Sequence, residues 1–325
     1  MTADEAAIAV DRLIGEAPCV VFAYHEIGFA CMEELIGLSA PILALFTHRD
    51  KPGEEIWWRS CTELARTCGI PIFTPEKLDS GWIARIGAMK PSIIYSFYYR
   101  NLLPAEVLRL APLGAYNLHG SMLPKYRGRA PVNWMIANGE REAGATLHHM
   151  VPRADAGDIV AQRPVTITDD DTALTLYRKI VPIAATIVRE CHPLIAAGRA
   201  PRRPQLLNDG SYYGRRRPED GRIDWTWPAR RIFNLVRAVT HPYPGAFCMA
   251  GGRKLFIWRA AMSNESGSYG APGMIIGTAR ESGAEVAAGD GSLTLMSVQF
   301  ESEPEADAAQ VLKMATGRWI TERLD

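Results

Sequence analysis

The strongest constraint on the fold is a pair of short apolar runs with a helical pattern between them. Residues 19–24 and 42–46 are apolar throughout and rich in residues that favour strands. Such runs are typical of strands that are buried on both faces of a parallel sheet. Residues 29–38 have the spacing of a helix. Strands that alternate with helices predict an α/β fold with a Rossmann-like, doubly wound and mostly parallel sheet.

The same alternation continues along the chain, although the first turn excludes one common ligand. Only one glycine, Gly28, stands between the first strand and helix, whereas a dinucleotide fingerprint needs three at fixed spacing, so NAD is rejected as the default cofactor. The later pattern predicts helices near 58–68, 82–89 and 172–197, strands at 70–73, 93–99, 145–151 and 159–165, and a strand that ends at His119.

Composition divides the 325 residues into three parts. Residues 1–16 contain a short helical face and are predicted to be an N-terminal extension. Residues 17–205 contain the strand and helix alternation and form a first domain. A stretch rich in Arg, Pro and Gly at 198–221 indicates a linker. Beyond it, one helix and several closely spaced strands suggest a small barrel, so residues 206–325 are assigned to the linker and a C-terminal β-rich domain.

The charge balance and the cysteines exclude several classes of protein. The 36 basic and 36 acidic residues give a net charge of zero, which argues against a protein that coats nucleic acid. The six cysteines contain no CxxC pair, so neither a zinc ribbon nor a disulfide scaffold is indicated. No secretory signal and no stretch of ~20 apolar residues is evident. We therefore expect a cytoplasmic protein without a membrane or nucleic-acid partner.

The candidate site lies at the end of an apolar run that contains Asn117 and His119 and is followed by a loop. Residues two apart in a strand share a face, so the carboxamide and the imidazole can project into one cleft. An amide donor can stabilise a developing oxyanion, and an imidazole can carry a proton near neutral pH. The loop that follows is basic and suits an anionic ligand, with Lys125, Arg127 and Arg129.

A nearby carboxylate would favour the charged form of His119, and Asp155 on the next polar turn is the candidate. A structural role is the alternative, because Asn and His at a strand end are often turn or core residues and Asp155 could shape the turn. A metal site is a further alternative. His148 and His149 are adjacent in a predicted strand and therefore point to opposite faces, which places them poorly around one ion, and we expect no metal.

The motif Asn117-Leu-His-Gly-Ser121, followed by Leu123-Pro-Lys-Tyr-Arg-Gly128, resembles the signature of formyltransferases that use 10-formyltetrahydrofolate. The motif Arg129-Ala-Pro-Val-Asn-Trp134 is similar to the branch that acts on UDP-4-amino-4-deoxy-L-arabinose, in the formyltransferase half of the bifunctional polymyxin-resistance enzymes of lipid A and lipopolysaccharide biosynthesis. Motifs at 20–25, 96–100 and 242–247 extend the resemblance over nearly all of the chain. It implies a catalytic first domain and an OB-like C-terminal domain.

The resemblance also implies roles for individual residues. Asn117, His119 and Asp155 occupy the positions of the catalytic residues, with the histidine as proton donor. Asn101 and Pro152 depart from the side chains expected in that branch, and Pro152 lacks an N–H donor for any main-chain contact. The positions that correspond to folate contacts, largely through the main chain, are Asn101, Leu102, Leu103, Arg129, Val151, Pro152, Arg153 and Ala154.

Several alternatives stay open on the sequence. A methionyl-tRNA formyltransferase would have the same chemistry, but the zero net charge gives weak evidence against a tRNA partner. A non-catalytic module that binds a nucleotide sugar or folate is a rival of another class, although the intact Asn117, His119 and Asp155 argue against it. The sugar could also be a dTDP-linked 4-amino hexose. A homo-oligomer is open, and any decarboxylase step would come from another protein.

Overall fold

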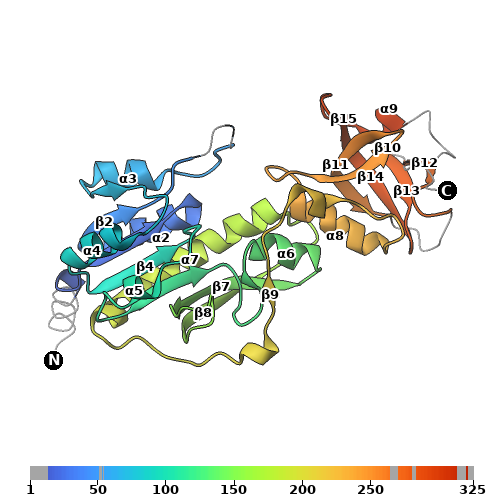
Figure 1. Ribbon diagram of the computed structural model, residues 1–325. Helices are drawn as coiled ribbons and strands as arrows, with labels where there is room; N and C mark the ends of the chain where they lie inside the picture. The colour runs from blue at the N-terminus through green and yellow to red at the C-terminus, as the bar shows by residue number, and fades with distance from the viewer. Residues whose placement is uncertain are drawn as a thin grey trace. The chain divides into compact units, whose positions relative to one another are not determined.

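Figure 1 shows the computed structural model, which describes residues 14–50, 53, 55–263, 270–279, 283–312 and 320. The chain forms two compact units, each assembled from separate stretches of the sequence. Unit 1 consists of Met1–Pro131, Glu142–Thr166 and Arg178–Tyr213. Unit 2 consists of Val132–Arg141, Ile167–Tyr177 and Gly214–Asp325. The predicted domain limits stay predictions, and nearly all of the predicted N-terminal helix lies outside the described residues.

Unit 1 is built on one sheet. Its strands are β1 (Cys19–Ala23), β2 (Ile42–Phe46), β3 (Ile72–Phe73), β4 (Ile93–Phe97), β5 (Ala115–His119), β7 (Glu142–His149) and β8 (Ile159–Thr166). They lie in the order β3-β2-β1-β4-β5-β7-β8. The first five run parallel to their neighbours, whereas β5–β7 and β7–β8 are antiparallel pairs. The predicted α/β fold with a mostly parallel sheet is confirmed.

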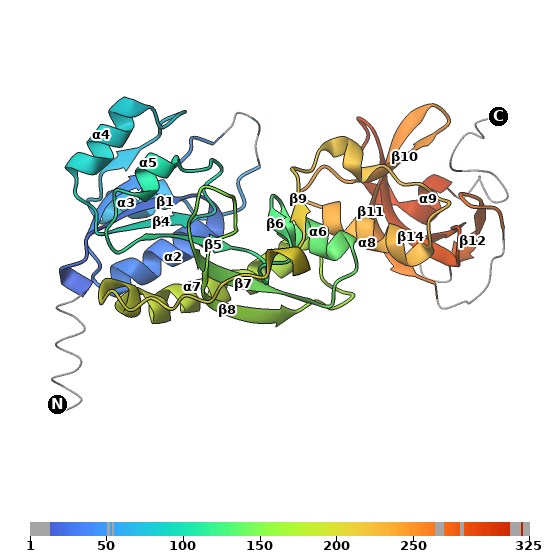
Figure 2. The same cartoon turned by 60° about the horizontal axis from the view of Figure 1, so that its bottom comes forward.

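Helices cover both faces of this sheet, as Figure 2 shows. Val107 and Ile86 share a core cluster with Val20 and Phe22 of β1 on one face. On the other face, the hydroxyl of Tyr95 lies 2.8 Å from the His192 ring. The helices are α2 (His25–Gly37), α3 (Cys61–Thr67), α4 (Ser80–Ala88), α5 (Ala105–Leu108) and α7 (Ala173–Ala196). Because helices bury both faces of the sheet, the strands are continuous apolar runs in the sequence.

The packing of the first turn of α2 against the sheet explains why residue 28 is a glycine. A Cβ at Gly28 would lie 3.2 Å from both Ala23 Cβ and the Phe97 carbonyl oxygen. The glycine therefore allows α2 to pack closely on the sheet, which is a packing function rather than part of a dinucleotide site. The helix begins at His25, four positions before the predicted start.

Unit 2 contains an antiparallel sheet in the order β10-β11-β14-β13-β12, with β15 paired to β14. This curled sheet confirms the predicted β-rich C-terminal domain. Its elements are α6 (Pro131–Ala137), apart from its first residue, η2 (Pro218–Gly221), α8 (Ala229–Val239), β10 (Ala246–Ala250), β11 (Arg253–Met262), β12 (Ile275–Ala279), β13 (Gly283–Ala287), β14 (Ser292–Phe300), β15 (Ala306–Asp307) and α9 (Ala308–Leu312).

The stretch predicted as a linker has more structure than its composition suggests. It contains η1 (Leu207–Asp209) and β9 (Tyr212–Tyr213), and β9 pairs in parallel with β6 (Arg127–Gly128) of the basic loop. This part of the chain therefore belongs to unit 1 up to Tyr213. No helix in the described parts of the chain combines the length and the apolar composition needed to cross a membrane.

Within unit 2, a buried arginine organises the polar contacts of α8. Arg237 is 6% exposed, and its guanidinium donates to the carbonyls of Thr168 and Asp171 at 2.9 and 3.0 Å and to Asn234 Oδ1. Burial lowers the pKa of Arg237 from its ordinary value, but the group stays charged because that value is above ~12. The guanidinium thus satisfies buried acceptors on Asn234 and Asp171 and a partly buried one on Thr168.

Arg237→Met should destabilise unit 2 by about 3 kcal/mol, because it leaves several buried acceptors without a donor. The matched control is Arg230→Met on the same helix, where a half-exposed guanidinium pairs with Asp169 at 2.9 Å and the cost should be less than about 1 kcal/mol. Urea titrations of both variants give the comparison. Equal losses in the two variants would contradict this account of Arg237.

Candidate active site

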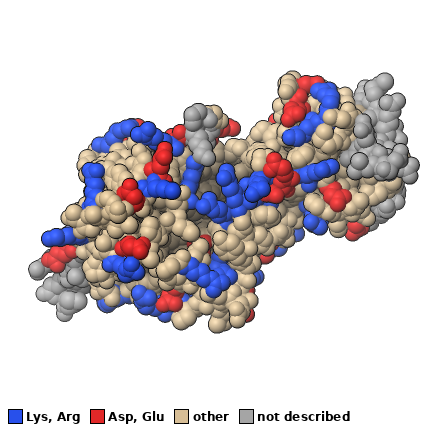
Figure 3. Space-filling model, viewed as in Figure 1, with Lys and Arg blue, Asp and Glu red and all other residues tan. Residues whose placement is uncertain are grey.

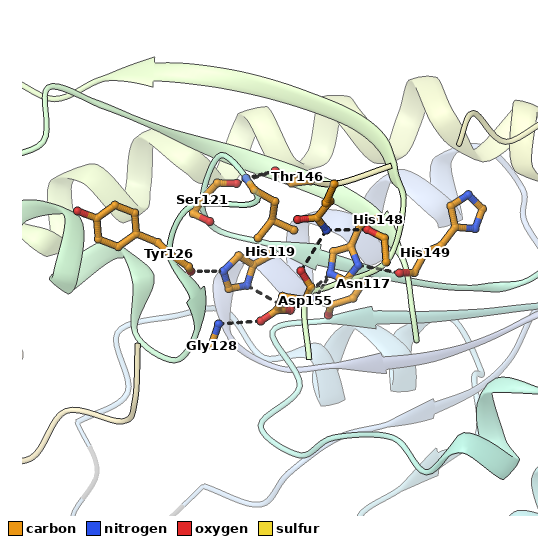
Figure 4. Close-up of polar contacts among 12 residues, drawn as sticks. Asn117, His119, Ser121, Tyr126, Gly128, Thr146, His148, His149 and Asp155 are labelled. Carbon is orange, nitrogen blue, oxygen red and sulfur yellow. Dashed lines mark hydrogen bonds and ion pairs between the residues drawn. The ribbon is translucent and has the colours of Figure 1, made fainter. Parts of the chain in front are cut away.

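The end of β5 places two functional side chains on one face of the sheet. Asn117 and His119 are separated by one residue, so both project toward the loop that follows the strand. His119 is buried and Asn117 is half-buried. Figure 4 shows that their side chains converge with Asp155, which comes from the turn after β7. The structure therefore brings the three predicted catalytic residues together.

The ring of His119 lies between two oxygen acceptors. Its Nε2 is 2.7 Å from the carbonyl oxygen of Tyr126. Because a carbonyl oxygen can only accept, Nε2 must carry a hydrogen. The other nitrogen, Nδ1, is 3.6 Å from Asp155 Oδ1. Both ring nitrogens therefore face an oxygen, and only the Tyr126 contact is short enough to be a hydrogen bond.

Asp155 is fixed by a left-handed turn and by a main-chain donor. Its φ is +51°, a conformation that Asp tolerates better than most residues. Its Oδ2 accepts a hydrogen bond of 2.9 Å from the Gly128 N–H. Burial alone would raise the pKa of Asp155, but the His119 ring, the His148 ring and the Gly128 N–H together outweigh burial and hold the pKa well below its usual range. The carboxyl group is therefore charged at neutral pH.

The amide of Asn117 has two partners. Its Nδ2 donates to Asp155 Oδ1 at 3.3 Å and lies 3.1 Å from His148 Nε2. His148 Nδ1 is 2.8 Å from the carbonyl oxygen of His149, so Nδ1 carries the hydrogen and Nε2 can accept from Asn117 in the neutral ring. The two hydrogens of the Asn117 amide thus point at a carboxylate and an imidazole.

His148 is a site residue that the sequence analysis considered only as a metal ligand. It lies opposite Asn117 in the β5–β7 pair, while His149 points away and its Nε2 is 3.0 Å from the Pro201 carbonyl oxygen. The predicted opposite orientation of the two histidines is therefore observed. The position of His148 opposite Asn117 follows from the pairing of two strands, and alternation along one strand does not predict it.

The basic loop presents fewer charges to a ligand than its sequence suggests. Arg127 is 5% exposed, and its guanidinium lies 3.5 Å from the Leu207 carbonyl oxygen. Lys125 and Arg129 are exposed. Arg129 donates to the Arg100 carbonyl oxygen at 3.3 Å, which brings the loop to the segment after β4. Arg129 therefore contacts the main chain of the residue before Asn101.

The other predicted folate residues form two segments of unit 1. Leu103 is buried in the core cluster that includes Ala115, with Met150 packed against it, so the two segments share this cluster. A cavity of about 340 Å³ is lined by Leu108, Ala115, Met150 and Val151, among others. His149, Asp158 and Arg202 also line this cavity, so its lining is mixed polar and apolar. The exposed members are Asn101, Leu102, Val151, Pro152 and Arg153.

An aromatic group lies at the carboxyl ends of β1, β2 and β4, where the strand order reverses. The rings of His25 and Trp58 stack at 3.8 Å, and Arg100 lies 4.4 Å from the centre of the Tyr24 ring. Burial, with a contribution from Arg100, lowers the pKa of His25 to about 3 and that of His48 to about 4. Both rings are therefore neutral near pH 7. Open α/β sheets bind ligands at such a reversal point.

The part of the chain that the structure describes contains no group of three or more His, Cys, Asp and Glu side chains arranged to hold a metal ion. His119, His148 and Asp155 converge, but their contacts are with the main chain, with Asn117 and with one another. The site therefore brings together two imidazoles, a carboxylate and an amide donor.

Comparison with solved structures shows a shared fold. The N-formyltransferase from Helicobacter canadensis, in complex with folinic acid and dTDP-3-aminofucose, is 20% identical with a TM-score of 0.68, over 87% of this chain and 99% of that one. WlaRD, a sugar 3N-formyl transferase solved with dTDP and 5-N-formyl-THF, is 18% identical with a TM-score of 0.65, over 89% and 99%.

HypX from Aquifex aeolicus is 18% identical with a TM-score of 0.60. The match covers 92% of this chain but 47% of that one, so the chain spans about half the length of HypX. Residues 34–189 match the family model described as formyl transferase, and residues 216–316 match that of the formyl transferase C-terminal domain. Because both matches occur in order and together span most of the residues, the chain belongs to the formyl transferase family and is a formyltransferase.

Proposed function

We propose that the enzyme transfers a formyl group from 10-formyltetrahydrofolate to the 4-amino group of a nucleotide-linked amino sugar, UDP-4-amino-4-deoxy-L-arabinose. The observation that supports this most is the convergence of Asn117, His119 and Asp155 within the N-terminal formyl transferase match. The resemblance of residues 117–134 to the polymyxin-resistance enzymes favours this sugar, in lipid A modification. The enzyme needs no metal in this proposal.

In the proposed mechanism, His119 supplies the proton and Asp155 keeps it available. The attacking amine must lose a proton, and the folate nitrogen that leaves must gain one. In its protonated form the His119 ring, between the Tyr126 carbonyl and Asp155, is suited to donate a proton to the folate nitrogen as its bond to the formyl carbon breaks. The neutral ring that results can accept the proton that the amine loses, so the ring is protonated again at the end of the transfer. Asp155 remains a carboxylate throughout, since its role is to favour the charged imidazole rather than to react.

Asn117 is proposed to stabilise the formyl oxygen as it gains negative charge. Its amide hydrogens face Asp155 and His148 in this structure. The weaker contact, 3.3 Å to Asp155, is the one that the formyl oxygen would replace. The hydrogen bond to His148 would then keep the amide in its orientation while the second hydrogen contacts the substrate.

The proposed folate site uses Asn101, Leu102 and Leu103 on one side and Val151 to Ala154 on the other, with Arg129 beside them. Contacts through the main chain tolerate the unusual side chain of Asn101. The main chain of Pro152 has no N–H, so it can only accept a hydrogen bond through its carbonyl oxygen.

The nucleotide is proposed to lie at the aromatic group after β1 and β4. The rings of Tyr24, His25 and Trp58 offer stacking surfaces for a base, and Arg100 offers a guanidinium of the kind that binds diphosphate. Sugar formyltransferases of the same fold were solved with dTDP or a dTDP-sugar. These ligands favour a dTDP-linked amino sugar as the alternative acceptor, and the 4-amino hexoses expected from the sequence are one class of it.

A charged tRNA is a less suitable acceptor. Acidic and basic side chains are intermixed over the face of the molecule in Figure 3, whereas tRNA binding favours an extended basic surface. A non-catalytic binding module would have no need of a charged imidazole next to a carboxylate with a depressed pKa. Turnover assays separate these alternatives.

We expect formylation of UDP-4-amino-4-deoxy-L-arabinose in the presence of 10-formyltetrahydrofolate, with kcat/KM at least about tenfold higher than for dTDP-linked 4-amino hexoses. Mass spectrometry of the products, with methionyl-tRNA as a third acceptor, measures the preference. EDTA should leave the rate unchanged. A preference for dTDP-sugars or tRNA would overturn the proposed acceptor, and loss of activity on chelation that zinc restores would overturn the metal-free mechanism.

His119→Ala should lower kcat by about a hundred- to a ten-thousandfold, because it removes the proton donor. Folate binding, measured by calorimetry, should stay within about threefold of the wild-type value. The matched control is His241→Ala in unit 2, whose exposed ring pairs with Glu305 and whose loss should leave the rate unchanged. Near wild-type kcat in His119→Ala, or an unfolded variant, would leave His119 as a structural residue.

Asp155→Asn removes the negative charge that favours the charged ring of His119, so the ring should lose its proton at a lower pH than in the wild type. Activity near neutral pH should fall, and the alkaline limb of the pH–rate profile should move to lower pH. The profile between about pH 6 and 9 and the NMR titration of His119 measure both effects. A less stable variant with unchanged titration would indicate that Asp155 only shapes the turn.

A further inference from the structure

The segment at residues 205–213, which we term the strap, contacts both partners of the His119 ring. Its composition predicted a linker, but it lies in unit 1 and its last residues form β9. None of the predicted site residues belongs to it. The strap approaches the turn that carries Asp155 and the loop that carries Tyr126, and these two contribute the acceptors on either side of the ring.

At one end of the strap, Gln205 contacts the Asp155 turn. Its Nε2 donates to the Asp155 carbonyl oxygen at 3.1 Å and to the Gly157 carbonyl oxygen at 2.6 Å. Asp155 has a φ of +51°, which costs an L-residue roughly 1–2 kcal/mol. A Cβ at Gly157 would lie 1.9 Å from the His149 carbonyl oxygen, so the turn packs against β7 without room to shift inward. Gln205 thus links two carbonyl oxygens of the same turn.

At the other end, Ser211 contacts the main chain of Tyr126. Its hydroxyl oxygen accepts from the Tyr126 N–H at 2.8 Å, and its carbonyl oxygen accepts from the Arg127 N–H at 3.0 Å. Tyr126 also has a positive φ, of +57°. Its carbonyl oxygen is the acceptor for His119 Nε2. Ser211 thus fixes the peptide whose oxygen orients the ring.

Between these ends, β9 pairs with β6 so closely that glycine is required. A Cβ at Gly128 would lie 2.2 Å from the Tyr213 carbonyl oxygen, and the φ of Gly128 is +98°. The N–H of the same glycine donates to Asp155 Oδ2. The rings of Tyr126 and Tyr213 stack at 4.9 Å, with an angle of 8° between their planes. The strap therefore supports two main-chain groups that contact the pair: the Gly128 N–H on Asp155 and the Tyr126 carbonyl oxygen on His119.

We propose that Gln205 and Ser211 are positioning residues for formyl transfer. Gln205 sets the direction of the Asp155 carboxylate, and Ser211 sets the position of the Tyr126 carbonyl, so together they maintain the charged form and the orientation of His119. This inference rests on the proposed catalytic roles of His119 and Asp155. Neither residue touches the reacting atoms, and each acts through one member of the pair.

The test begins with Gln205→Met, which retains the length of the side chain but removes the donor, and Ser211→Ala, which removes the acceptor. A displacement of about 1 Å in a reacting geometry typically costs up to about a hundredfold, so kcat should fall about ten- to a hundredfold in each variant, with KM values within about threefold of wild type. Leu206→Ala is the matched control, because this side chain is 70% exposed. It should have the wild-type kcat.

A second measurement distinguishes positioning from a general loss of stability. In an Asp155→Asn background, Gln205→Met should lower kcat by less than about a further twofold, because the carboxylate that it positions is already absent. In a His119→Ala background, Ser211→Ala should likewise add little. Multiplicative losses in these double variants would overturn the proposal.

The NMR titration of His119 tests the strap without substrates. In Gln205→Met the ring should lose its proton at a lower pH than in the wild type, whereas Leu206→Ala should leave the titration unchanged. If the wild-type enzyme formylated none of the acceptors, the proposed function would fail while this titration still decided the role of the strap. An unchanged titration in Gln205→Met would overturn the positioning role of Gln205.

Discussion

The active site depends on a buried imidazole whose two nitrogens both face oxygen. A charged ring is costly in a low-dielectric site unless opposite charge and hydrogen bonds offset the lost hydration. Asp155 supplies the charge at 3.6 Å and the Tyr126 carbonyl supplies the hydrogen bond at 2.7 Å. Neither acceptor is in β5, the strand that carries His119. The rest of the local structure holds the Tyr126 peptide and the Asp155 turn in these positions.

Those peptides adopt conformations that an isolated chain would avoid. Tyr126 and Asp155 have φ values of +57° and +51°, and each costs roughly 1–2 kcal/mol for an L-residue. The pairing of β6 with β9 and the two hydrogen bonds of Gln205 stabilise these conformations. Backbone strain of this kind persists only where the surrounding contacts determine it, and such sites are often functional. The strap is therefore needed to maintain the strained geometry.

Short-range patterns in the sequence were sufficient for the sheet and for two members of the site. The apolar runs located β2 and the end of β5, and alternation along β5 predicted that Asn117 and His119 share a face. The polar turn made Asp155 a candidate carboxylate, and the resemblance favoured a catalytic role over a turn-shaping one. Interactions between distant segments could not be predicted in this way: the register that places His148 opposite Asn117 depends on strand pairing, and the contact of Gln205 with the Asp155 turn spans 50 residues. Composition alone made that segment resemble a linker.

Asp155 also links the amide to the imidazole. Its Oδ1 faces Asn117 Nδ2 at 3.3 Å, His148 Nε2 at 3.5 Å and His119 Nδ1 at 3.6 Å, while Oδ2 accepts from the Gly128 N–H. One carboxylate oxygen is thus shared by the proposed oxyanion donor and the proposed acid. If the turn moved, the amide and the imidazole would lose their common partner together. A movement of Asp155 would therefore change the orientation of the Asn117 amide and of the His119 ring together. The turn is held at two points, by the Gly128 N–H on the carboxylate and by Gln205 on the main-chain carbonyl.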